Sequence, residues 1–251
     1  MAFTSPDSYD RFMGRYSTLL GPQLADLAGV AGGQRALDVG CGPGALTGEL
    51  VKRLGPESVS AVDPSAPFVT ATQERYPGVD VQVAAADDLP FPDDRFDATL
   101  AQLVVHFMKD PVAGLNEMRR VTRPGGVVAA CVWDHGGGQG PLFRFWEAAR
   151  RLDDGVDDES HLPGVREGDL GELFRLAGLD HVEETSLTVE VEHPTFDDWW
   201  EPFTLGVGPA GWYFASLDPN RQAQLREAIL ETSPATSLVV SAVAWAARGV
   251  A

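Results

Sequence analysis

Hydrophobic runs and amphipathic stretches alternate along the first half of the chain. Residues 35–40 and 59–63 form apolar runs of strand length, and in residues 45–54 between them the apolar side chains recur at helical spacing. This alternation is typical of parallel strands joined by crossover helices. Its continuation predicts helices over 65–76 and 112–121 and strands over 79–83, 96–103 and 127–133. The first half therefore predicts a doubly wound α/β sheet.

The pattern changes after Trp133. A run of glycines at 136–138 opens an amphipathic stretch, 141–152, followed by the acidic, turn-rich residues 153–163. We interpret these two segments as an inserted helix and a mobile loop. The remaining segments are predicted as a helix over 168–177, a strand over 182–191, an aromatic segment over 196–214, a helix over 219–231 and a strand over 238–246.

A single domain over residues 1–251 is the simplest organisation, because no repeat or linker divides the chain. We expect N-terminal cap helices over 1–30 and insertions over 136–165 and 195–233. The length of 251 residues and a hydrophobic content of 44% are sufficient for one large α/β core.

Charge narrows the classes of partner. The chain carries 37 acidic against 19 basic residues, a formal net charge of −18. An acidic surface without clustered Lys or Arg lacks the electrostatic attraction that supplies most nucleic-acid affinity. We therefore expect no nucleic acid and no membrane among the partners.

The sequence also indicates a compartment. Cys41 and Cys131 are too few and too far apart for a disulfide framework or a zinc site. The first 20 residues contain no apolar signal region, and no later stretch reaches about 18 uninterrupted apolar residues. A cytoplasmic protein is the expectation, while the oligomeric state stays open.

Residues 37–44 read Leu-Asp-Val-Gly-Cys-Gly-Pro-Gly and carry the strongest chemical signal. Alternating glycines allow a tight turn and let main-chain N–H groups approach a ligand. Such loops usually cradle a pyrophosphate, which Asp38 would repel. A ligand with a nucleoside at one end and a cationic amino acid at the other fits Asp38, and S-adenosylmethionine is such a ligand.

The glycine spacing by itself admits a second cofactor. Gly40-x-Gly42-x-x-Ala45 also satisfies the dinucleotide fingerprint, and Asp63 follows about 20 residues on, where either ligand class places a ribose acceptor. An NAD-dependent oxidoreductase is therefore an alternative, against which Asp38 counts. A tight turn without any ligand is a further alternative.

Residues 37–44 resemble motif I of the class I S-adenosylmethionine-dependent methyltransferases. Further segments resemble that family over roughly residues 35–133, and most closely its small-molecule branch (methyltransferase type 11-like), related to ubiquinone and sterol modification enzymes. The resemblance implies a Rossmann-like seven-stranded sheet, mostly parallel with an antiparallel last strand, with helical insertions in the C-terminal half. The matching segments are Val-Asp-Pro-Ser at 62–65, Asp-Leu-Pro-Phe at 88–91, Phe-Asp at 96–97, Glu-Met-Arg-Arg-Val at 117–121 and Arg-Pro-Gly-Gly at 123–126.

The resemblance assigns cofactor roles to residues at the strand ends. Asp63 would accept both ribose hydroxyls because a carboxylate offers two oxygens; a helix N-cap before Pro64 is its structural alternative. Asp38 would hold the cationic methionine end, directly or through water, or else brace the loop. Gln102, followed by Leu103, is expected to contact the methionine portion. The predicted cofactor residues on these strands and loops are Asp38, Gly40, Gly42, Asp63, Pro64, Gln102 and Leu103.

Adenine recognition departs from the family pattern. The family often places an acid where this chain has Ala85. We expect Ala86 to offer its backbone N–H to the ring and Asp87 to accept from the exocyclic amine, with simple solvation of Asp87 as the alternative. In the N-terminal segment, Arg15 could pair with the cofactor carboxylate and Tyr9 or Tyr16 could pack beside the sulfonium. The alternative is a surface helix whose aromatic side chains dock on the sheet.

The catalytic signal is weaker. His106, after the fourth strand, is the leading candidate for a general base and His135 the second, although an isolated histidine is more often a packed residue. No metal is expected, because the histidines show no paired ligand spacing. Six tryptophans, four of them in or beside the insertions, suggest a pocket for a partly aromatic or apolar small-molecule acceptor.

The sequence thus predicts a methyltransferase that uses S-adenosyl-L-methionine, with S-adenosyl-L-homocysteine as the product. The methyl group would pass by in-line displacement to an O, N or C nucleophile, mainly through proximity. The alternative from another class is a cofactor-binding protein of the same fold without transfer activity.

Overall fold

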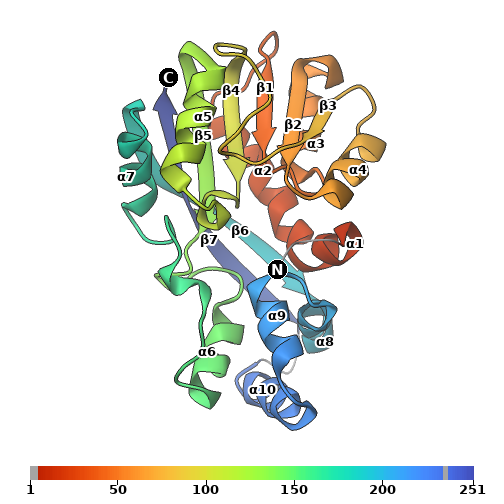
Figure 1. Cartoon of the computed structure of the whole chain (residues 1–251). Coiled ribbons are helices and arrows are strands. Elements are labelled where there is room, and N and C mark those ends of the chain that lie inside the picture. Colours follow the sequence, from red (N-terminus) through yellow and green to blue (C-terminus); the bar gives the residue numbers. More distant parts are fainter. Residues whose placement is uncertain (1–4, 234–236) are drawn as a thin grey trace.

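The computed structural model describes residues 5–233 and 237–251. Within them, seven strands form one sheet in the order β3-β2-β1-β4-β5-β7-β6 (Figure 1). Only β7 runs antiparallel to its neighbours β5 and β6. The predicted mostly parallel sheet with an antiparallel last strand is confirmed. The strands are β1 Ala36–Val39, β2 Val59–Asp63, β3 Asp80–Val83, β4 Phe96–Gln102, β5 Thr122–Trp133, β6 Asp180–His193 and β7 Leu238–Val250.

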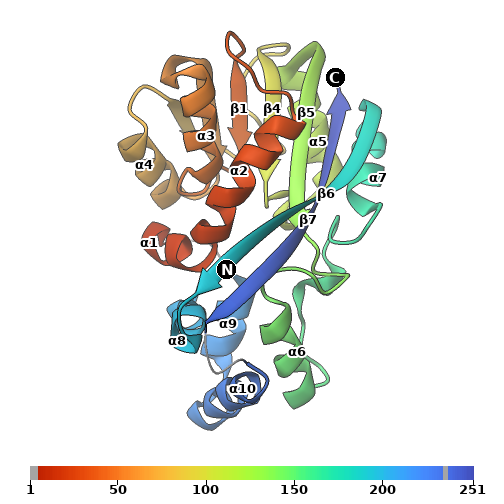
Figure 2. The same ribbon diagram turned by 180° about the vertical axis from the view of Figure 1, so that it is seen from behind.

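Helices cover both faces of the sheet. α2, α3 and α4 lie on one face, and α5 and α7 on the other (Figures 1 and 2). The helices are α1 Pro6–Tyr9, α2 Arg15–Leu27, α3 Ala45–Leu54, α4 Ala66–Arg75, α5 Pro111–Val121, α6 Phe143–Leu152, α7 Asp169–Leu176, α8 Phe196–Trp200, α9 Gly208–Ser216 and α10 Pro219–Glu231. Short turns are η1 Asp10–Gly14, η2 Pro56–Ser58, η3 Val105–Phe107, η4 Glu159–His161 and η5 Glu201–Leu205.

Strand β1 shows how the sequence divides the core. Ala36 packs in the cluster that includes α2 and α3, whereas Leu37 and Val39 pack in the cluster that includes α5 and α7. Successive side chains of a strand point to opposite faces, so a short apolar run supplies both cores. Asp38 lies at the position that shares a face with Ala36, and there it meets Thr47 of α3.

Strands β6 and β7 extend well beyond the rest of the sheet. Their pairing continues to His193 opposite Leu238, and at that end they carry α8, α9 and α10, near α6 (Figure 2). The sequence placed these strands over 182–191 and 238–246, which is too short. Backbone pairing continues through polar residues, so the hydrophobic pattern underestimates the length. The helices of the two insertions therefore gather below the carboxyl ends of the parallel strands.

Strand β5 also begins earlier than expected. The sequence predicted a turn over 123–126 and a strand from 127, but β5 starts at Thr122. Gly125 has a φ of +77° and donates its N–H to the carbonyl of Ala251, whose own N–H reaches the carbonyl of Gly126. The register with β4 shifts between Phe96 and Ala98. The predicted glycine turn therefore lies within β5, where it forms an irregularity of the strand.

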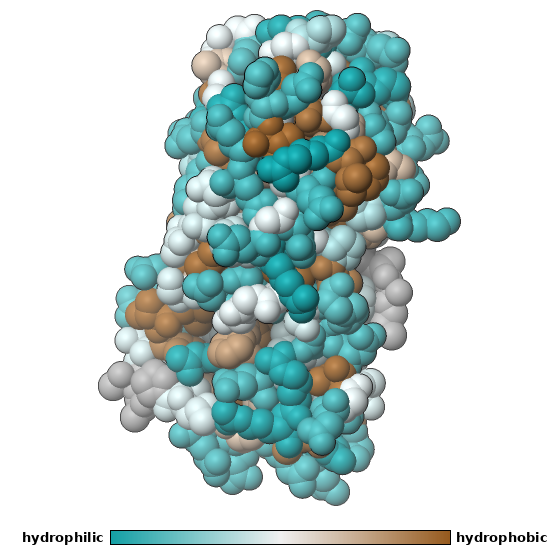
Figure 3. Space-filling model, turned by 90° about the vertical axis from the view of Figure 1, so that its left-hand side faces the viewer, coloured by the Kyte–Doolittle hydropathy of each residue, from teal (hydrophilic) through white to brown (hydrophobic). Residues whose placement is uncertain are grey.

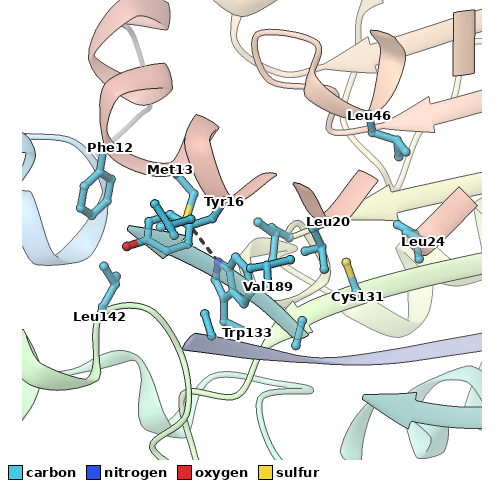
Figure 4. Packing of buried hydrophobic residues seen from close by; sticks show 14 of the residues in the cluster. Phe12, Met13, Tyr16, Leu20, Leu24, Leu46, Cys131, Trp133, Leu142 and Val189 are labelled. Carbon is cyan, nitrogen blue, oxygen red and sulfur yellow. Dashed lines mark hydrogen bonds between the residues drawn. The ribbon is translucent and has the colours of Figure 1, made fainter. Parts of the chain in front are cut away.

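The N-terminal helices cross the sheet toward the insertions. The predicted cap over 1–30 consists of α1, the π-helical turn η1 and α2, with residues 1–4 outside the described part. Figure 4 shows Met13 and Tyr16 directed at Trp133 of β5, and the Trp133 indole N–H donates to Met13 Sδ at 3.3 Å. The cap is therefore anchored where β5 ends.

The face of the molecule shown in Figure 3 is mainly hydrophilic. On the face shown in Figure 3, apolar residues form separate patches among polar ones, in line with the excess of acidic residues. In the described part of the chain, every helix is too short or too polar to cross a bilayer.

Candidate functional site

The carboxyl ends of β1, β2 and β4 surround a cavity of about 390 Å³, which we call the central cavity. In open α/β sheets this edge, where the strand order reverses, is the usual ligand site. Tyr9 and Trp212 reach the same space from α1 and α9. Six of the predicted cofactor residues line it: Gly40, Gly42, Asp63, Pro64, Gln102 and Leu103.

The glycine loop is shaped by close packing. Gly40 has a φ of +72°, and a Cβ built there would lie 2.4 Å from Cγ2 of Val104. No side chain fits that space, which only glycine leaves open. Gly42 donates its N–H to Asp63 Oδ2 at 2.9 Å. The loop after β1 is therefore tied to the end of β2.

Asp63 is buried and braces two loops. Its Oδ2 accepts from Gly42, and its Oδ1 accepts from the Ser65 N–H at 2.8 Å. The alternative of a helix N-cap at Asp63 is wrong, because α4 begins at Ala66 with Ser65 as its cap. Burial raises the pKa of Asp63, whereas the two backbone N–H groups oppose that rise. Each carboxylate oxygen keeps a lone pair for a further donor.

Asp38 is a buried acid with an unused acceptor. Thr47 Oγ1 donates to its Oδ2 at 2.6 Å, whereas Oδ1 has no hydrogen-bond partner among the described residues. Burial raises the pKa of Asp38 to about 7, against the Thr47 hydrogen bond and with some help from Asp63. A bound cation would stabilise the ionised form, and an anion would oppose it.

The end of β4 contributes a second acceptor. Gln102 Nε2 donates to the Ser17 carbonyl of α2 at 3.0 Å, and its Oε1 has no partner among the described residues. The next residue, Leu103, has a φ of +61°, which is uncommon for a residue with a Cβ, and its N–H bonds the Cys131 carbonyl. Strained backbone of this kind clusters at ligand sites.

A side cavity adjoins the central one. Ala86 and Asp87 line it, and it shares Gly40, Pro64, Val104 and Phe107 with the central cavity. The two residues expected at adenine therefore lie beside the glycine loop, and Ala85, the position that lacks the family's acid, lies with them.

A smaller space of about 30 Å³, the inner cavity, also adjoins the central one. It shares Tyr9, Leu103 and Phe107 with the central cavity, so these three residues border both spaces. Burial raises the pKa of Tyr9 to about 12, so its hydroxyl stays protonated at neutral pH. Both predicted base candidates, His106 and His135, line the inner cavity.

His106 is a buried imidazole in η3, and its Nδ1 has no hydrogen-bond partner among the described residues. Burial, and secondarily His135, lower the pKa of His106 well below its usual range. Both histidines are joined in this cavity by Glu159, which sequence reasoning missed. Glu159 lies in the segment interpreted as a mobile loop, yet it is only 4% exposed. An acid in an acidic run gives no sequence signal of burial.

Arg15 does not line the central cavity, so its predicted pairing with the cofactor carboxylate is wrong. Its guanidinium donates to Asp198 at 2.7 Å and lies 2.8 Å from Nδ1 of His193. The Arg15 hydrogen bond holds the pKa of Asp198 below its usual value. At the start of α2 the side chain faces the corner of β6 and α8, where a carboxylate already satisfies it.

The tryptophans divide between cavities and core. Trp212 lines the central cavity and Trp133 the inner one. Trp199 and Trp200 are buried in the hydrophobic core that spans the insertions, and Trp146 is buried against Glu159. The aromatic grouping predicted as a pocket wall is thus mostly core.

A family model described as a methyltransferase domain matches residues 37–130. An uncharacterized methyltransferase of Mycobacterium sp. (strain KMS) is 32% identical over 209 residues, which cover 78% of this chain and 81% of the relative. A chloroplastic 2-methyl-6-phytyl-1,4-hydroquinone methyltransferase of rice is 39% identical over 100 residues, 39% of this chain and 28% of the relative. The chain spans less than half the length of the first curated relatives it matches.

Among solved structures, the geranyl diphosphate C-methyltransferase of Streptomyces coelicolor A3(2) aligns with a TM-score of 0.54 at 16% identity, covering 95% of this chain and 80% of that one. That structure contains Mg²⁺, geranyl diphosphate and S-adenosyl-L-homocysteine. At this identity the likeness concerns the fold alone.

Proposed function

We propose that this chain, which belongs to the class I S-adenosylmethionine-dependent methyltransferases, transfers the sulfonium methyl group of S-adenosylmethionine to a nucleophilic atom of a small molecule. Relatives that the chain matches in part are named for methyl transfer to a hydroquinone and to malonyl-[acyl-carrier protein]. The side and inner cavities both share lining residues with the central cavity, so cofactor and acceptor would be held close together.

The observation that carries the proposal is the chemistry of the unpaired acceptors. Asp38 Oδ1 and Gln102 Oε1 are buried oxygens without a donor in the described residues, on the neighbouring strands β1 and β4. A buried acceptor left unpaired costs about 1–3 kcal/mol. The ammonium group of a bound methionine moiety supplies donors and positive charge, whereas a pyrophosphate supplies neither. The residues present therefore fit S-adenosylmethionine better than NAD.

The other predicted cofactor residues would hold different parts of the cofactor in the central and side cavities. Asp63 would accept the ribose hydroxyls with its free lone pairs, while Ala86 and Asp87 would meet adenine in the side cavity. Gly40 and Gly42 keep the loop close enough for main-chain contact. When bound, S-adenosylmethionine supplies an electrophilic methyl group, which needs no redox chemistry from the protein.

The chain's own contribution to the reaction is positioning. Tyr9, Leu103 and Phe107 line both the central and the inner cavity, and there they would orient the acceptor toward the methyl group. Holding two reactants in line can replace several kcal/mol of activation free energy. The acceptor side is lined by apolar Met13 and Trp133, which suits a partly aromatic or apolar molecule. The inner cavity is too small for such a molecule, so α1 or α9 must shift to admit it.

Transfer is tested with S-adenosylmethionine labelled in its methyl group and a panel of small hydroxylated, aminated and C-nucleophilic metabolites. Label in an acceptor, with S-adenosylhomocysteine formed in equal amount, is the expected result. Tight binding of S-adenosylhomocysteine with no transfer to any acceptor would favour a binding protein without activity. Calorimetric binding of NADH without binding of S-adenosylhomocysteine would favour the oxidoreductase.

Asp38 should make cofactor affinity depend on pH. Because the pKa of Asp38 in the ligand-free protein is about 7, the carboxylate becomes charged as the pH rises through that value. S-adenosylhomocysteine, with its ammonium group, should therefore bind more tightly above pH 7 than below it. In Asp38→Asn the affinity should be weaker and this pH dependence lost, as measured by calorimetry. An unchanged slope in Asp38→Asn would assign the dependence to another group.

The raised pKa of Asp38 also predicts a pH dependence of folding stability, opposite in sign to its effect on cofactor affinity. Between the usual pKa of 3.8 and about 7, the folded chain holds a proton on Asp38 that the unfolded chain releases. The free energy of unfolding of the ligand-free protein should thus fall as the pH rises across this interval. The difference between wild type and Asp38→Asn in urea titrations at several pH values isolates this contribution.

A further inference from the structure

Three side chains with metal-binding atoms meet in the inner cavity. His106, His135 and Glu159 each offer one ligand atom, and these atoms lie within 4.8 Å of one another. They come from three separate segments: η3 after β4, the turn after β5, and η4 after α6. Spacing along the chain therefore gave no paired motif, although the fold assembles a set of two imidazoles and one carboxylate.

Glu159 is held in place, and among the described residues its only ion-pair partner is an imidazole, that of His135. Its Oε2 accepts from the Trp146 indole N–H at 2.9 Å, and its Oε1 lies 3.8 Å from His135 Nε2. The latter distance is too long for a direct hydrogen bond. A carboxylate that is 4% exposed is costly without a partner of opposite charge.

His106 supplies an independent observation. Its side chain is also 4% exposed, and Nδ1 has no hydrogen-bond partner among the described residues. Its ring centroid lies 6.0 Å from that of His135. A buried imidazole nitrogen of this kind is a ready ligand atom, because no hydrogen bond has to be broken before a metal binds.

The segments that carry His135 and Glu159 are rigidly supported. Asp134, fully buried, accepts from the Gly137 N–H at 2.7 Å and from Gln139 Nε2 at 3.0 Å, which fixes the turn after β5. Asp158 pairs with Arg150 of α6 and caps η4 through the Ser160 N–H. Ligand sets that bind metal ions depend on this kind of second layer.

We propose that the inner cavity binds a divalent transition-metal ion of the zinc type through His106, His135 and Glu159, and that the ion holds and activates a hydroxyl group of the acceptor. Two imidazoles and a carboxylate suit Zn²⁺, Co²⁺ or Fe²⁺ rather than Mg²⁺, which prefers oxygen ligands. Three protein ligands leave a position open for the acceptor. The proposal rests on the proposed methyl transfer and specifies its substrate class as small molecules with a hydroxyl nucleophile.

This methyl transfer to a metal-bound hydroxyl group needs no further reactant. Coordination lowers the pKa of the acceptor hydroxyl, and its proton passes to solvent. An oxygen lone pair forms the bond to the methyl carbon, and the electron pair of the methyl–sulfur bond stays on sulfur, which yields S-adenosylhomocysteine. Leu103 and Phe107 border both cavities, so the activated oxygen and the methyl group would meet there.

The test is metal binding itself, measured on the full chain after removal of metals with a chelator. Titration with Co²⁺ should give saturable visible absorption at one equivalent, and Zn²⁺ should displace it. His106→Ala, His135→Ala and Glu159→Gln should each weaken Co²⁺ binding at least about tenfold. Glu159→Gln keeps an oxygen for the Trp146 N–H and so limits damage to folding, which thermal unfolding checks.

The matched control is His161→Ala. His161 lies in the same turn η4, and its exposed side chain places Nε2 3.4 Å from Asp157 Oδ1. Its loss should therefore leave Co²⁺ binding unchanged. Absence of stoichiometric binding, or binding insensitive to the three variants, overturns the proposal. The proposal also fails if the wild type binds no metal and Glu159→Gln still loses methyl transfer. That result would show that the cluster acts in acid–base catalysis rather than in metal binding. Calorimetry with S-adenosylhomocysteine on the same samples tests the proposed function separately.

Discussion

Replacing Asp63 by alanine should weaken the binding of S-adenosylhomocysteine by roughly ten- to a hundredfold. A charge-assisted hydrogen bond contributes about 1.5–3 kcal/mol, and each 1.4 kcal/mol corresponds to about a factor of ten in the dissociation constant. The substitution also removes the acceptor for the Gly42 and Ser65 N–H groups, so the loop after β1 loses its tie to β2. Calorimetry at constant pH measures the change directly.

Two further variants separate the ligand contact from the loop brace. Asp63→Asn keeps one acceptor oxygen and the side-chain shape, so it should retain more of the fold than alanine while still losing the charge. Asp88→Ala removes an exposed acid of the next loop and should leave affinity unchanged. Equal affinity in wild type and Asp63→Ala, with both proteins folded, would remove Asp63 from the binding site.

Gly40→Ala should both destabilise the protein and abolish tight cofactor binding. The new Cβ would lie 2.4 Å and 2.6 Å from the two γ-methyl carbons of Val104, and the φ of +72° is itself unfavourable for alanine. The backbone cost is about 1 kcal/mol and overpacking typically adds about 1–3 kcal/mol. We expect the melting temperature to fall by roughly 4–12 °C in differential scanning calorimetry.

A matched glycine isolates the clash. Gly33 has a φ of +89° but no atom within 4 Å of a built Cβ, so Gly33→Ala should show the backbone cost alone. Combining Gly40→Ala with Val104→Ala should recover part of the stability, because the clashing methyl groups are gone. If Gly40→Ala and Gly33→Ala lowered the melting temperature equally, contact with Val104 would not be the reason for glycine at position 40.

The parallel half of the fold could be predicted because its signals are local. Helix α3 begins and ends where its apolar spacing and the flanking Gly44 and Gly55 place it. The six cofactor residues that line the central cavity all follow or end a predicted strand. Since parallel strands end at one sheet edge, locating the strands also locates those residues.

The predictions failed where a residue's partner lies far away in sequence. Arg15 finds Asp198, 183 positions later, so its neighbours gave no reason to exclude a cofactor contact. Glu159 stands in a run of acids, a pattern that predicts an exposed segment. In the structure, however, Trp146 and Arg150 of α6 anchor its turn. The ends of β6 and β7 depend on mutual pairing rather than on their own apolar pattern.

By itself, the sequence determined the order of strands and crossover helices in the first half of the chain, the glycine loop, and the acids at the ends of β1 and β2. Each of these is encoded by neighbouring residues, through side-chain periodicity and backbone freedom. Only the tertiary structure decided which polar atoms remain unpaired, which cavities adjoin, and that two histidines and Glu159 share one of them. Those features depend on long-range packing, which brings separate loops to one sheet edge and buries their charges together.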